Sequence, residues 1–272
     1  MGKAQEYPLG YSAQEAQRLA DQAAQLEEFT EDVLRRAGLR RGMQVLDIGS
    51  GVGDVSLLAA RMVGSDGAVL GIDKASSSVE SARRRVAALG LQNVSFEESD
   101  LAAFAPDKKF DAIVGRFVLS YVPDRATVLR SLTRYLKPGA IVALQELDMS
   151  QISEAPPSEL FMQARRWILE AFAATGAELD MGTKLYATFL QAGLPAPNMI
   201  ATFPVVGGAA SPGYEHLVQG LRSLLPLIER SGIAKTAEIG IDTLAQRLRE
   251  DAAANERVIF MSRAVGAWAR LT

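Results

Sequence analysis

The chain lacks cysteine and has a single histidine, His216, among its 272 residues. Without cysteine it cannot build a disulfide framework, a thiolate metal site, a thiol nucleophile or a thiol-based redox switch. One histidine cannot form a zinc site made of histidines alone, and a serine–histidine–aspartate triad would depend on that residue. We therefore expect no metal site in this protein.

The chain also lacks a net positive charge and long apolar runs. The formal net charge is −3, whereas nucleic acids and anionic membranes favour a basic surface. No apolar run approaches the roughly 20 residues of a membrane-spanning helix, and residues 1–10 are too polar for a signal peptide. We expect a cytoplasmic protein whose partner is a small molecule, with no nucleic acid and no membrane insertion; a homodimer stays open.

The pattern of apolar segments predicts an α/β fold. Apolar residues make up 48% of the chain and charged residues 22%, which is the composition of a globular protein. Apolar strands that alternate with helices indicate a parallel, doubly wound sheet covered by helices on both faces. Strands are expected at residues 45–48, 68–72, 94–97, 110–114 and 140–147, and helices at 55–62, 76–89 and 124–136.

The alternation loosens after residue 148. We interpret the helices expected there as a cap over the edge of the sheet where the loops gather; the alternative is that they only cover a sheet edge. Residues 7–38 are also expected to be helical, because Ser12 and Glu15 have the spacing of a capping box and Gly38 suits a C-terminal cap. The later helices are expected at residues 158–174, 182–192, 214–231 and 239–253, with strands at 199–206 and 258–268.

A cluster of alternating glycines follows the first expected strand. Gly49, Gly51 and Gly53 stand between that strand and a helix. Glycine permits the positive φ angles of a sharp turn and lets a ligand approach the backbone, and the N-terminus of the helix offers unpaired N–H groups. The cluster therefore predicts a ligand-binding loop, although a tight strand–helix turn is the alternative.

Two acidic residues follow the next two strands. Asp73 ends the second strand, 20 residues after Gly53, where a carboxylate can accept hydrogen bonds from both ribose hydroxyls of a nucleoside. Asp100 follows the third strand, where it can accept a hydrogen bond from an adenine amino group. Because these loops share the carboxyl edge of a doubly wound sheet, the three features together predict an adenosine-binding site.

The residues beside the glycines indicate which adenosine cofactor binds. Asp47 precedes the loop and Asp54 follows it, so two carboxylates would repel a pyrophosphate. The spacing Gly-x-Gly-x-Gly also differs from the Gly-x-Gly-x-x-Gly of dinucleotide sites. Carboxylates at this place suit a ligand with an ammonium group, and S-adenosylmethionine carries both an ammonium group and a cationic sulfonium.

Several motifs resemble those of class I S-adenosylmethionine-dependent methyltransferases. Residues 45–54 resemble the glycine-rich first motif of that family. Asp73, Asp100, the strand at residues 110–116 and the sequence Leu-Lys-Pro-Gly at 136–139 resemble its later motifs, in order and at suitable spacing. The chain is most similar to the small-molecule methyltransferases of menaquinone and ubiquinone biosynthesis.

The resemblance covers about residues 39–148 and carries implications for the fold. It implies a Rossmann-like sheet of seven mostly parallel strands with an antiparallel last strand, and S-adenosylmethionine along its carboxyl edge. The implied domains are an N-terminal helical lid at residues 1–38, the S-adenosylmethionine-binding core at 39–150 and, at 151–272, a helical cap with the last strands of the sheet.

The resemblance also implies roles for single residues. Asp47, Gly49 and Gly51 would line the methionine end of the cofactor and Asp73 would hold the ribose. The adenine would lie at Asp100 and Leu101, and Arg116 and Phe117 would lie near the methyl-bearing sulfur. The expected cofactor-binding residues are Tyr11, Asp47, Gly49, Ser50, Gly51, Gly53, Asp73, Lys74, Asp100, Leu101, Arg116, Phe117 and Tyr121.

Methyl transfer needs alignment more than it needs a catalytic side chain. The cofactor supplies the leaving group, so the protein mainly orients the acceptor, and a base is needed only where the acceptor must lose a proton. His216, at the start of a cap helix, and Glu146, which with Asp148 ends the fifth strand, are the candidate bases. The alternatives are a surface or structural histidine and a solvated strand end.

Motifs and residues that the chain lacks exclude several classes of methyl acceptor. The fourth strand runs into Gly115-Arg116-Phe117-Val118, which lacks the Asn/Asp-Pro-Pro-aromatic motif of enzymes that methylate exocyclic amines. The lack of cysteine closes the covalent route to cytosine C5 and the thiol-bound route to arsenite. The three arginines at residues 83–85 fan around a helix and form no basic stripe. A small organic acceptor remains.

The sequence thus predicts S-adenosylmethionine-dependent methyl transfer to a small, mostly apolar organic acceptor, bound between the cap and residues 116–121. Two alternatives stay open. One is a non-catalytic or repurposed S-adenosylmethionine-binding protein, and the other is an NAD-dependent oxidoreductase, which the glycine spacing disfavours.

Overall fold

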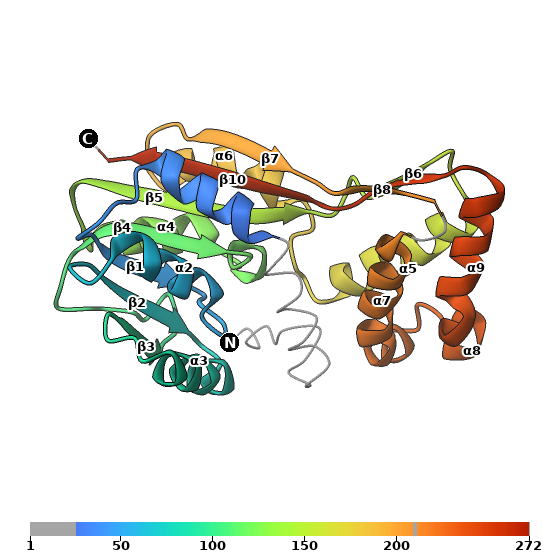
Figure 1. Cartoon of the computed structure of the whole chain (residues 1–272), viewed down its shortest axis with the longest axis horizontal. Coiled ribbons are helices and arrows are strands. Elements are labelled where there is room, and N and C mark those ends of the chain that lie inside the picture. The colour runs from blue at the N-terminus through green and yellow to red at the C-terminus, as the bar shows by residue number, and fades with distance from the viewer. Residues whose placement is uncertain (1–25, 209–210, 272) are drawn as a thin grey trace. The chain divides into compact units, whose positions relative to one another are not determined.

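The computed structural model describes residues 26–208 and 211–271 (Figure 1). The chain divides into two units, and each is considered by itself. We call the first unit the sheet unit. Its described part comprises residues 26–146, Met181–Ala201 and 265–271. The second, the helical unit, comprises Leu147–Asp180 and the described part of Thr202–Ala264.

The sheet unit is built on seven strands in the order β3-β2-β1-β4-β5-β10-β7 (Figure 1). Parallel pairing joins β1 to β2 and β4, β2 to β3, and β4 to β5, whereas β10 runs antiparallel. This arrangement confirms the expected doubly wound sheet and its antiparallel last strand. The strands are β1 (Gln44–Ile48), β2 (Ala68–Asp73), β3 (Val94–Glu98), β4 (Phe110–Arg116), β5 (Leu136–Asp148), β7 (Asn198–Thr202) and β10 (Arg263–Arg270).

Helices cover both faces of this sheet because both faces of its strands are apolar. Alternate residues such as Val45 and Leu46 point to opposite faces and enter two separate cores. One core includes side chains of the helix at residues 26–37, of α2 (Asp54–Val63) and of α3 (Ser76–Leu89). The other includes side chains of α4 (Arg125–Thr133) and α6 (Met181–Gln191). β1 is therefore covered on both sides, and its residues 45–48 are buried.

The helical unit has a three-stranded antiparallel sheet and its own core. Its strands β6 (Ser153–Ala155), β9 (Val258–Phe260) and β8 (Val205–Gly207) pair in that order. The apolar faces of its longer helices meet in one cluster of buried side chains. These helices are α5 (Glu159–Ala174), α7 (Pro212–Arg230) and α9 (Ile241–Ala254), with the short α8 (Thr236–Ile239) before α9.

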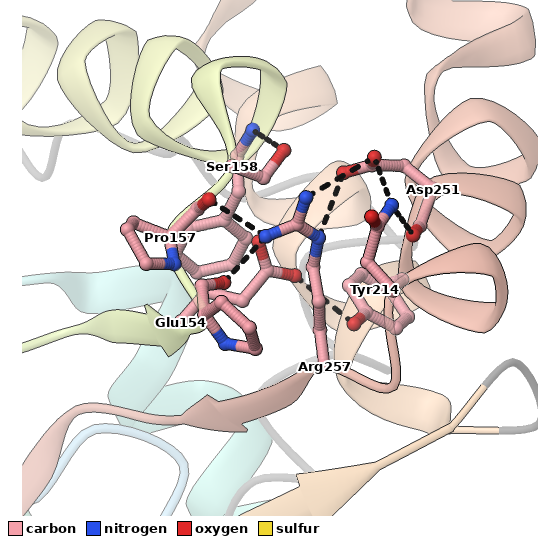
Figure 2. Close-up of polar contacts among 9 residues, drawn as sticks. Glu154, Pro157, Ser158, Tyr214, Asp251 and Arg257 are labelled. Atoms are coloured by element: carbon pink, nitrogen blue, oxygen red, sulfur yellow. Dashed lines mark hydrogen bonds and ion pairs between the residues drawn. The ribbon is translucent and has the colours of Figure 1, made fainter.

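A buried polar network joins the elements of the helical unit (Figure 2). Nη1 of Arg257 donates to the backbone carbonyls of Pro156 and Pro157, each at 2.6 Å, and its Nε lies 3.2 Å from Oδ2 of Asp251. The hydroxyl of Tyr214 donates to Oε1 of Glu154 at 3.1 Å. Burial raises the pKa of Glu154. The network ties α7, α9 and the connection between β6 and α5 together.

Three expectations about elements were wrong in detail. The strand expected at residues 258–268 is two strands, because β9 pairs with β6 and β8 while β10 joins the large sheet. The strand expected at 199–206 is likewise divided into β7 and β8. The helix expected at 239–253 is divided at Gly240, whose φ of 59° is left-handed.

The helix expected at residues 182–192 was assigned to the cap, and the structure corrects this. It forms α6, and its Met181, Leu185 and Phe189 are fully buried in the second core of the sheet unit. The apolar spacing of α6 is the same whichever surface it covers, so the sequence pattern predicts the helix but not its partner.

Candidate functional site

The glycine loop between β1 and α2 is shaped by left-handed backbone. Gly49, Gly51 and Gly53 have φ angles of 62°, 54° and 92°, which side chains other than glycine rarely adopt. The N–H of Ser50 donates to the carbonyl of Ile72 at 2.9 Å and fixes the loop to β2. The sequence expectation of a sharp turn at these three glycines is therefore confirmed.

The space beside each glycine differs. A Cβ atom on Gly53 would lie 2.7 Å from Cζ of Phe96, and one on Gly49 would overlap the side chain of Val118. At Gly51, by contrast, no heavy atom of the described chain lies within 4 Å of the Cβ position. Gly49 and Gly53 are thus required by packing as well as by backbone, whereas Gly51 borders open space that a ligand can enter.

Asp73, at the end of β2, holds the glycine loop. Its Oδ2 accepts the N–H of Gly51 at 2.9 Å and its Oδ1 accepts the N–H of Ala75 at 2.9 Å. Each carboxylate oxygen can accept a further hydrogen bond, and the residue is half-buried. The carboxylate is therefore oriented by the loop and retains the capacity to bind ribose hydroxyls.

Asp47 is a buried carboxylate below the loop. Its Oδ2 accepts the hydroxyl of Ser56 at 2.5 Å, while Oδ1 has no hydrogen-bond partner among the described residues. Burial raises its pKa to about 7, and the Ser56 hydrogen bond and the charge of Arg116 oppose that rise. Oγ of Ser50 is also buried and without a described partner. Two buried groups without a described partner thus lie at or next to the glycine loop, and such groups need an explanation, for which a bound ligand is one candidate.

Arg116, at the end of β4, is held by residues that the sequence did not single out. Its Nη1 donates to Oγ1 of Thr30 at 3.0 Å, and Thr30, fully buried in the helix at residues 26–37, lies 3.1 Å from Oε1 of Gln145. Burial lowers the pKa of Arg116. The hydroxyl of Thr30 therefore fixes the guanidinium, and Thr30 is itself hydrogen-bonded to Gln145 of β5.

Phe117 adopts an uncommon backbone conformation. Its φ is 60°, in the left-handed region that a bulky residue seldom occupies, and its N–H donates to the carbonyl of Gln145 at 2.8 Å. The ring lies 5.8 Å from the guanidinium carbon of Arg116. Such strain persists only where the surroundings enforce it and clusters at functional sites. No sequence pattern predicts it, because the residue is an ordinary aromatic.

Asp54 and the arginines at 83–85 have structural partners. Asp54 forms an ion pair with Arg85 at 2.8 Å, and Arg85 also donates to the carbonyl of Val52 at 2.6 Å. Arg83 donates instead to the carbonyl of Phe96. The expectation that these arginines form no basic stripe is confirmed. Because Asp54 is neutralised, only Asp47 carries the argument against a pyrophosphate.

The remaining expected cofactor residues lie on the loops of this unit. Asp100 is exposed and its Oδ1 accepts the N–H of Ala102 at 2.8 Å, and Leu101 is half-buried next to it. Lys74 is exposed after β2, and Tyr121 is half-buried in the 3₁₀-helix η1 (Leu119–Tyr121). Tyr11 lies outside the described residues, as does most of the expected lid.

The two candidate bases lie in different units. Glu146 is fully buried: Oε1 accepts the N–H groups of Val118 at 2.9 Å and Leu119 at 2.6 Å, and Oε2 accepts the hydroxyl of Ser120 at 2.8 Å. Burial raises its pKa to about 7. It is a buried cap of η1, not a solvated strand end. His216 is half-buried on α7 of the helical unit.

The described residues contain no group of three or more acids or histidines placed to bind a metal ion. A membrane-crossing helix, long and apolar throughout, is also absent from the described part of the chain.

The family of the chain follows from comparison with known proteins. Residues 39–192, more than half of the chain, match a family model described as a methyltransferase domain, so the chain belongs to this methyltransferase family. A 2-phytyl-1,4-naphtoquinone methyltransferase of Synechococcus elongatus is 40% identical over 141 residues, which are 49% of this chain and 58% of the relative. A demethylmenaquinone methyltransferase of Geobacillus stearothermophilus is 33% identical over 120 residues, 44% of this chain and 51% of the relative.

The chain spans about half the length of the curated relatives it matches. Among solved structures, a SAM-dependent methyltransferase from Aquifex aeolicus superimposes with a TM-score of 0.56 over 96% of this chain and 100% of that chain, at 20% identity. That likeness supports the fold. The comparisons together confirm the family resemblance predicted from the motifs, and S-adenosylmethionine as the cofactor of the family.

The residues of the site fit this cofactor. The unsatisfied Oδ1 of Asp47 can accept an ammonium N–H, the space beside Gly51 lets a ligand approach the backbone, and Asp73 has free acceptor capacity. These groups stand at the carboxyl ends of β1 and β2, next to β4, where the strand order reverses. Ligands of doubly wound sheets bind at this switch point.

Proposed function

We propose that this protein transfers a methyl group from S-adenosylmethionine to a small, mostly apolar acceptor of the quinone type. The observation that carries the proposal is the buried, unsatisfied Oδ1 of Asp47 at the end of the strand that leads into the glycine loop, in a chain of the methyltransferase family. The acceptor class is supported by the relatives, whose names specify demethylmenaquinone and a phytyl-naphtoquinone.

The residues of the sheet unit would bind the cofactor by charge and shape. When bound, the cofactor supplies a methyl group on a sulfonium, which is already an activated leaving group. Asp47 would hold the ammonium group, and Asp73 would hold the ribose hydroxyls while it keeps the glycine loop in place. Asp100 and Leu101 would frame the adenine, and Arg116 and Phe117 would border the methyl-bearing end.

The contribution of the protein to catalysis would be alignment. In-line displacement requires the acceptor atom, the methyl carbon and the sulfur to be collinear, and holding them so lowers the barrier without a covalent intermediate. The strained backbone of Phe117, fixed by Gln145, and the guanidinium of Arg116, fixed by Thr30, would keep this wall rigid.

The test is the transfer of label from methyl-tritiated S-adenosylmethionine to reduced naphthoquinones, with and without an isoprenoid chain. We expect label in the organic phase with at least one of these acceptors, and none with the Gly51→Ala variant. Binding of the cofactor without transfer to any member of the series would contradict the proposal and favour a non-catalytic S-adenosylmethionine-binding protein. Oxidation of added NADH by the oxidised naphthoquinones, with hydride passing to the quinone, would favour an oxidoreductase.

A further inference from the structure

Buried polar atoms without a partner occur in two places outside the network of Figure 2. Among the described residues, Oδ1 of Asp47 and Oγ of Ser50 lie in the site already described. The other two atoms are guanidinium nitrogens of the helical unit, Nε of Arg165 and Nε of Arg263. Buried donors are nearly always satisfied in folded proteins, so a pair of unsatisfied ones needs an explanation.

The two arginines are anchored to the same turn. Arg165, on α5, donates from Nη2 to the carbonyl of Ser150 at 2.6 Å. Arg263, the first residue of β10, donates from Nη2 to Oδ2 of Asp148. Within the turn, the N–H and the hydroxyl of Ser150 donate to Oδ1 of Asp148 at 3.0 and 2.5 Å. Each guanidinium is thus fixed through Nη2 to residues 148–150, while its Nε–H stays unused.

Arg257 shows what a purely structural arginine of the same unit looks like (Figure 2). Its Nη1 serves two carbonyls, its Nη2 contacts Oδ1 of Asp251, and its Nε faces Oδ2 of the same carboxylate at 3.2 Å. Nε of Arg257 makes no hydrogen bond, but the ion pair with Asp251 places a carboxylate beside it. Nε of Arg165 and of Arg263 is also buried without a hydrogen bond. Arg263, however, approaches its carboxylate through Nη2, and Arg165 donates from Nη2 to a backbone carbonyl.

The charge and the apolar surroundings of this turn indicate which kind of ligand could accept hydrogen bonds from the two unused Nε–H groups. Two guanidinium groups contact this turn, which holds one carboxylate: Arg165 donates to the carbonyl of Ser150, and the oxygens of Asp148 accept from Arg263 and Ser150. The turn therefore has one positive charge in excess, and charge-assisted hydrogen bonds from arginine favour an oxyanion. Met149, in the same turn, is half-buried against the apolar core of the helical unit. The matching ligand combines an oxyanion with an apolar body.

We propose that Arg165 and Arg263 form an oxyanion-binding site that holds a carboxylate or phenolate oxygen of an apolar, aromatic ligand. That this ligand is the methyl acceptor rests on the proposed function. The site itself does not, because it is argued from residues of the helical unit alone.

The experiment measures binding of 1-hydroxy-2-naphthoate by calorimetry, with its methyl ester as the ligand that lacks the carboxylate. We expect the acid to bind at least tenfold more tightly than the ester. Arg165→Gln and Arg263→Gln should each weaken binding of the acid by tenfold or more. The matched control is Arg166→Gln, which removes the same charge from the exposed neighbour of Arg165 on α5 and should change affinity less than twofold.

Thermal melting checks that each variant is folded, and Arg165→Lys and Arg263→Lys serve where a glutamine variant does not fold. Lysine keeps the charge but loses the Nε–H of the guanidinium plane, so affinity for the acid should still fall several-fold. Equal binding of acid and ester, or equal losses in Arg165→Gln and Arg166→Gln, would overturn the site.

Inorganic phosphate is the third probe. If it binds as tightly as the naphthoate and depends on the same arginines, the ligand is a free anion and the assignment to the acceptor is overturned. Titration with S-adenosylhomocysteine separates this proposal from the proposed function. The affinity for S-adenosylhomocysteine should be the same in all arginine variants as in the wild type. If the wild-type protein does not bind S-adenosylhomocysteine at all, the proposed function is contradicted, but the oxyanion site is not.

Discussion

The proposed cofactor site depends on Asp47 more than on any other residue. A fully buried carboxylate with one unsatisfied oxygen is costly unless a cation approaches it. The pKa of about 7 means that this group is only partly ionised near neutral pH. A bound ammonium group would favour the ionised form, so binding of the cofactor and deprotonation of Asp47 should be linked.

This linkage predicts a pH-dependent affinity. The affinity for S-adenosylhomocysteine, which retains the ammonium group, should rise about tenfold from pH 6 to pH 8 as Asp47 ionises. The Asp47→Asn variant should bind more weakly at pH 8 and show little of this dependence. Calorimetry at several pH values is the measurement.

Glu146 provides the control for that experiment, because its pKa is also raised to about 7 by burial. Glu146→Gln should keep the pH dependence of affinity, since its partners are groups of the chain. If Asp47→Asn keeps the dependence and Glu146→Gln loses it, the assignment of the ammonium group to Asp47 is wrong.

Gly51 and Gly53 should separate binding from stability. An alanine at either position is held at a positive φ, which costs about 1–2 kcal/mol of folding free energy. In Gly53→Ala the new methyl group also meets Phe96, so the loss should be mainly of thermal stability. In Gly51→Ala it enters the open space, so cofactor affinity should fall much further than stability. Equal losses of affinity per folded molecule in both variants would contradict a ligand at Gly51.

At the scale of elements, the loop between β4 and η1 is organised by a carboxylate from the neighbouring strand. Glu146 of β5 accepts two backbone N–H groups and a hydroxyl at the start of η1, where a helix begins with unpaired donors. The same loop holds the strained Phe117. The sequence suggested Glu146 as a candidate base because it ends a strand near the expected reaction centre. Its hydrogen bonds could not be predicted, because its three partners lie 26 to 28 positions earlier in the chain.

Two substitutions of Glu146 decide between a structural and a catalytic role. Glu146→Ala should destabilise the protein by about 2–3 kcal/mol, because buried donors lose their acceptor. Glu146→Gln keeps one acceptor oxygen and should retain turnover within about tenfold. A fall of roughly 10²–10⁴ in turnover for a folded glutamine variant would identify Glu146 as a general base.

The pH dependence of folding gives Glu146 a further readout. Its pKa in the folded protein, about 7, lies above the ordinary 4.5. A carboxyl with a raised pKa contributes stability that is fully present below about pH 4.5 and is lost as the pH rises through 7. Glu146→Gln should therefore gain stability relative to the wild type between pH 5 and pH 8, measured by thermal melting. A constant difference across that range would contradict a buried, titrating Glu146.

The elements themselves were predictable to different degrees. The strands β1 to β4 and the glycine turn follow from short apolar runs and from glycines that the backbone requires. The division of residues 258–268 between two sheets was not predictable, because a continuous apolar run carries no sign of a change of partner. Thr30 and Gln145 were missed for a similar reason: a buried threonine of a helix and an amide of a strand become site residues only through contacts distant in sequence.

At the scale of the whole molecule, the two units have separate hydrophobic cores, and each contains a different set of candidate functional residues. The candidate cofactor residues that the structure describes belong to the sheet unit, whereas His216 and the two arginines of the oxyanion site belong to the helical unit. Motifs predicted the first set because the family shares them. The helical unit has no motif of that kind, and only the buried unsatisfied donors pointed to Arg165 and Arg263.

Hydrogen exchange read by mass spectrometry should show this division. Addition of S-adenosylhomocysteine should slow exchange at residues 49–53, 73–75, 100–102 and 116–121, because a bound ligand suppresses local opening of the loops that contact it. The buried turns of α9 in the helical unit should exchange as before. Protection confined to the helical unit would contradict the placement of the cofactor.

The most direct test of the account is calorimetric titration of the wild-type protein with S-adenosylhomocysteine and, separately, with NAD. We predict one binding site for the former and no measurable heat with the latter. Asp73→Ala should weaken binding by about 5- to 150-fold, the equivalent of about 1–3 kcal/mol for a lost hydrogen-bonding carboxylate. Asp66→Ala, which removes an exposed carboxylate from the turn before β2, should leave it unchanged. Tighter binding of NAD than of S-adenosylhomocysteine, or equal effects of the two substitutions, would contradict the central claim.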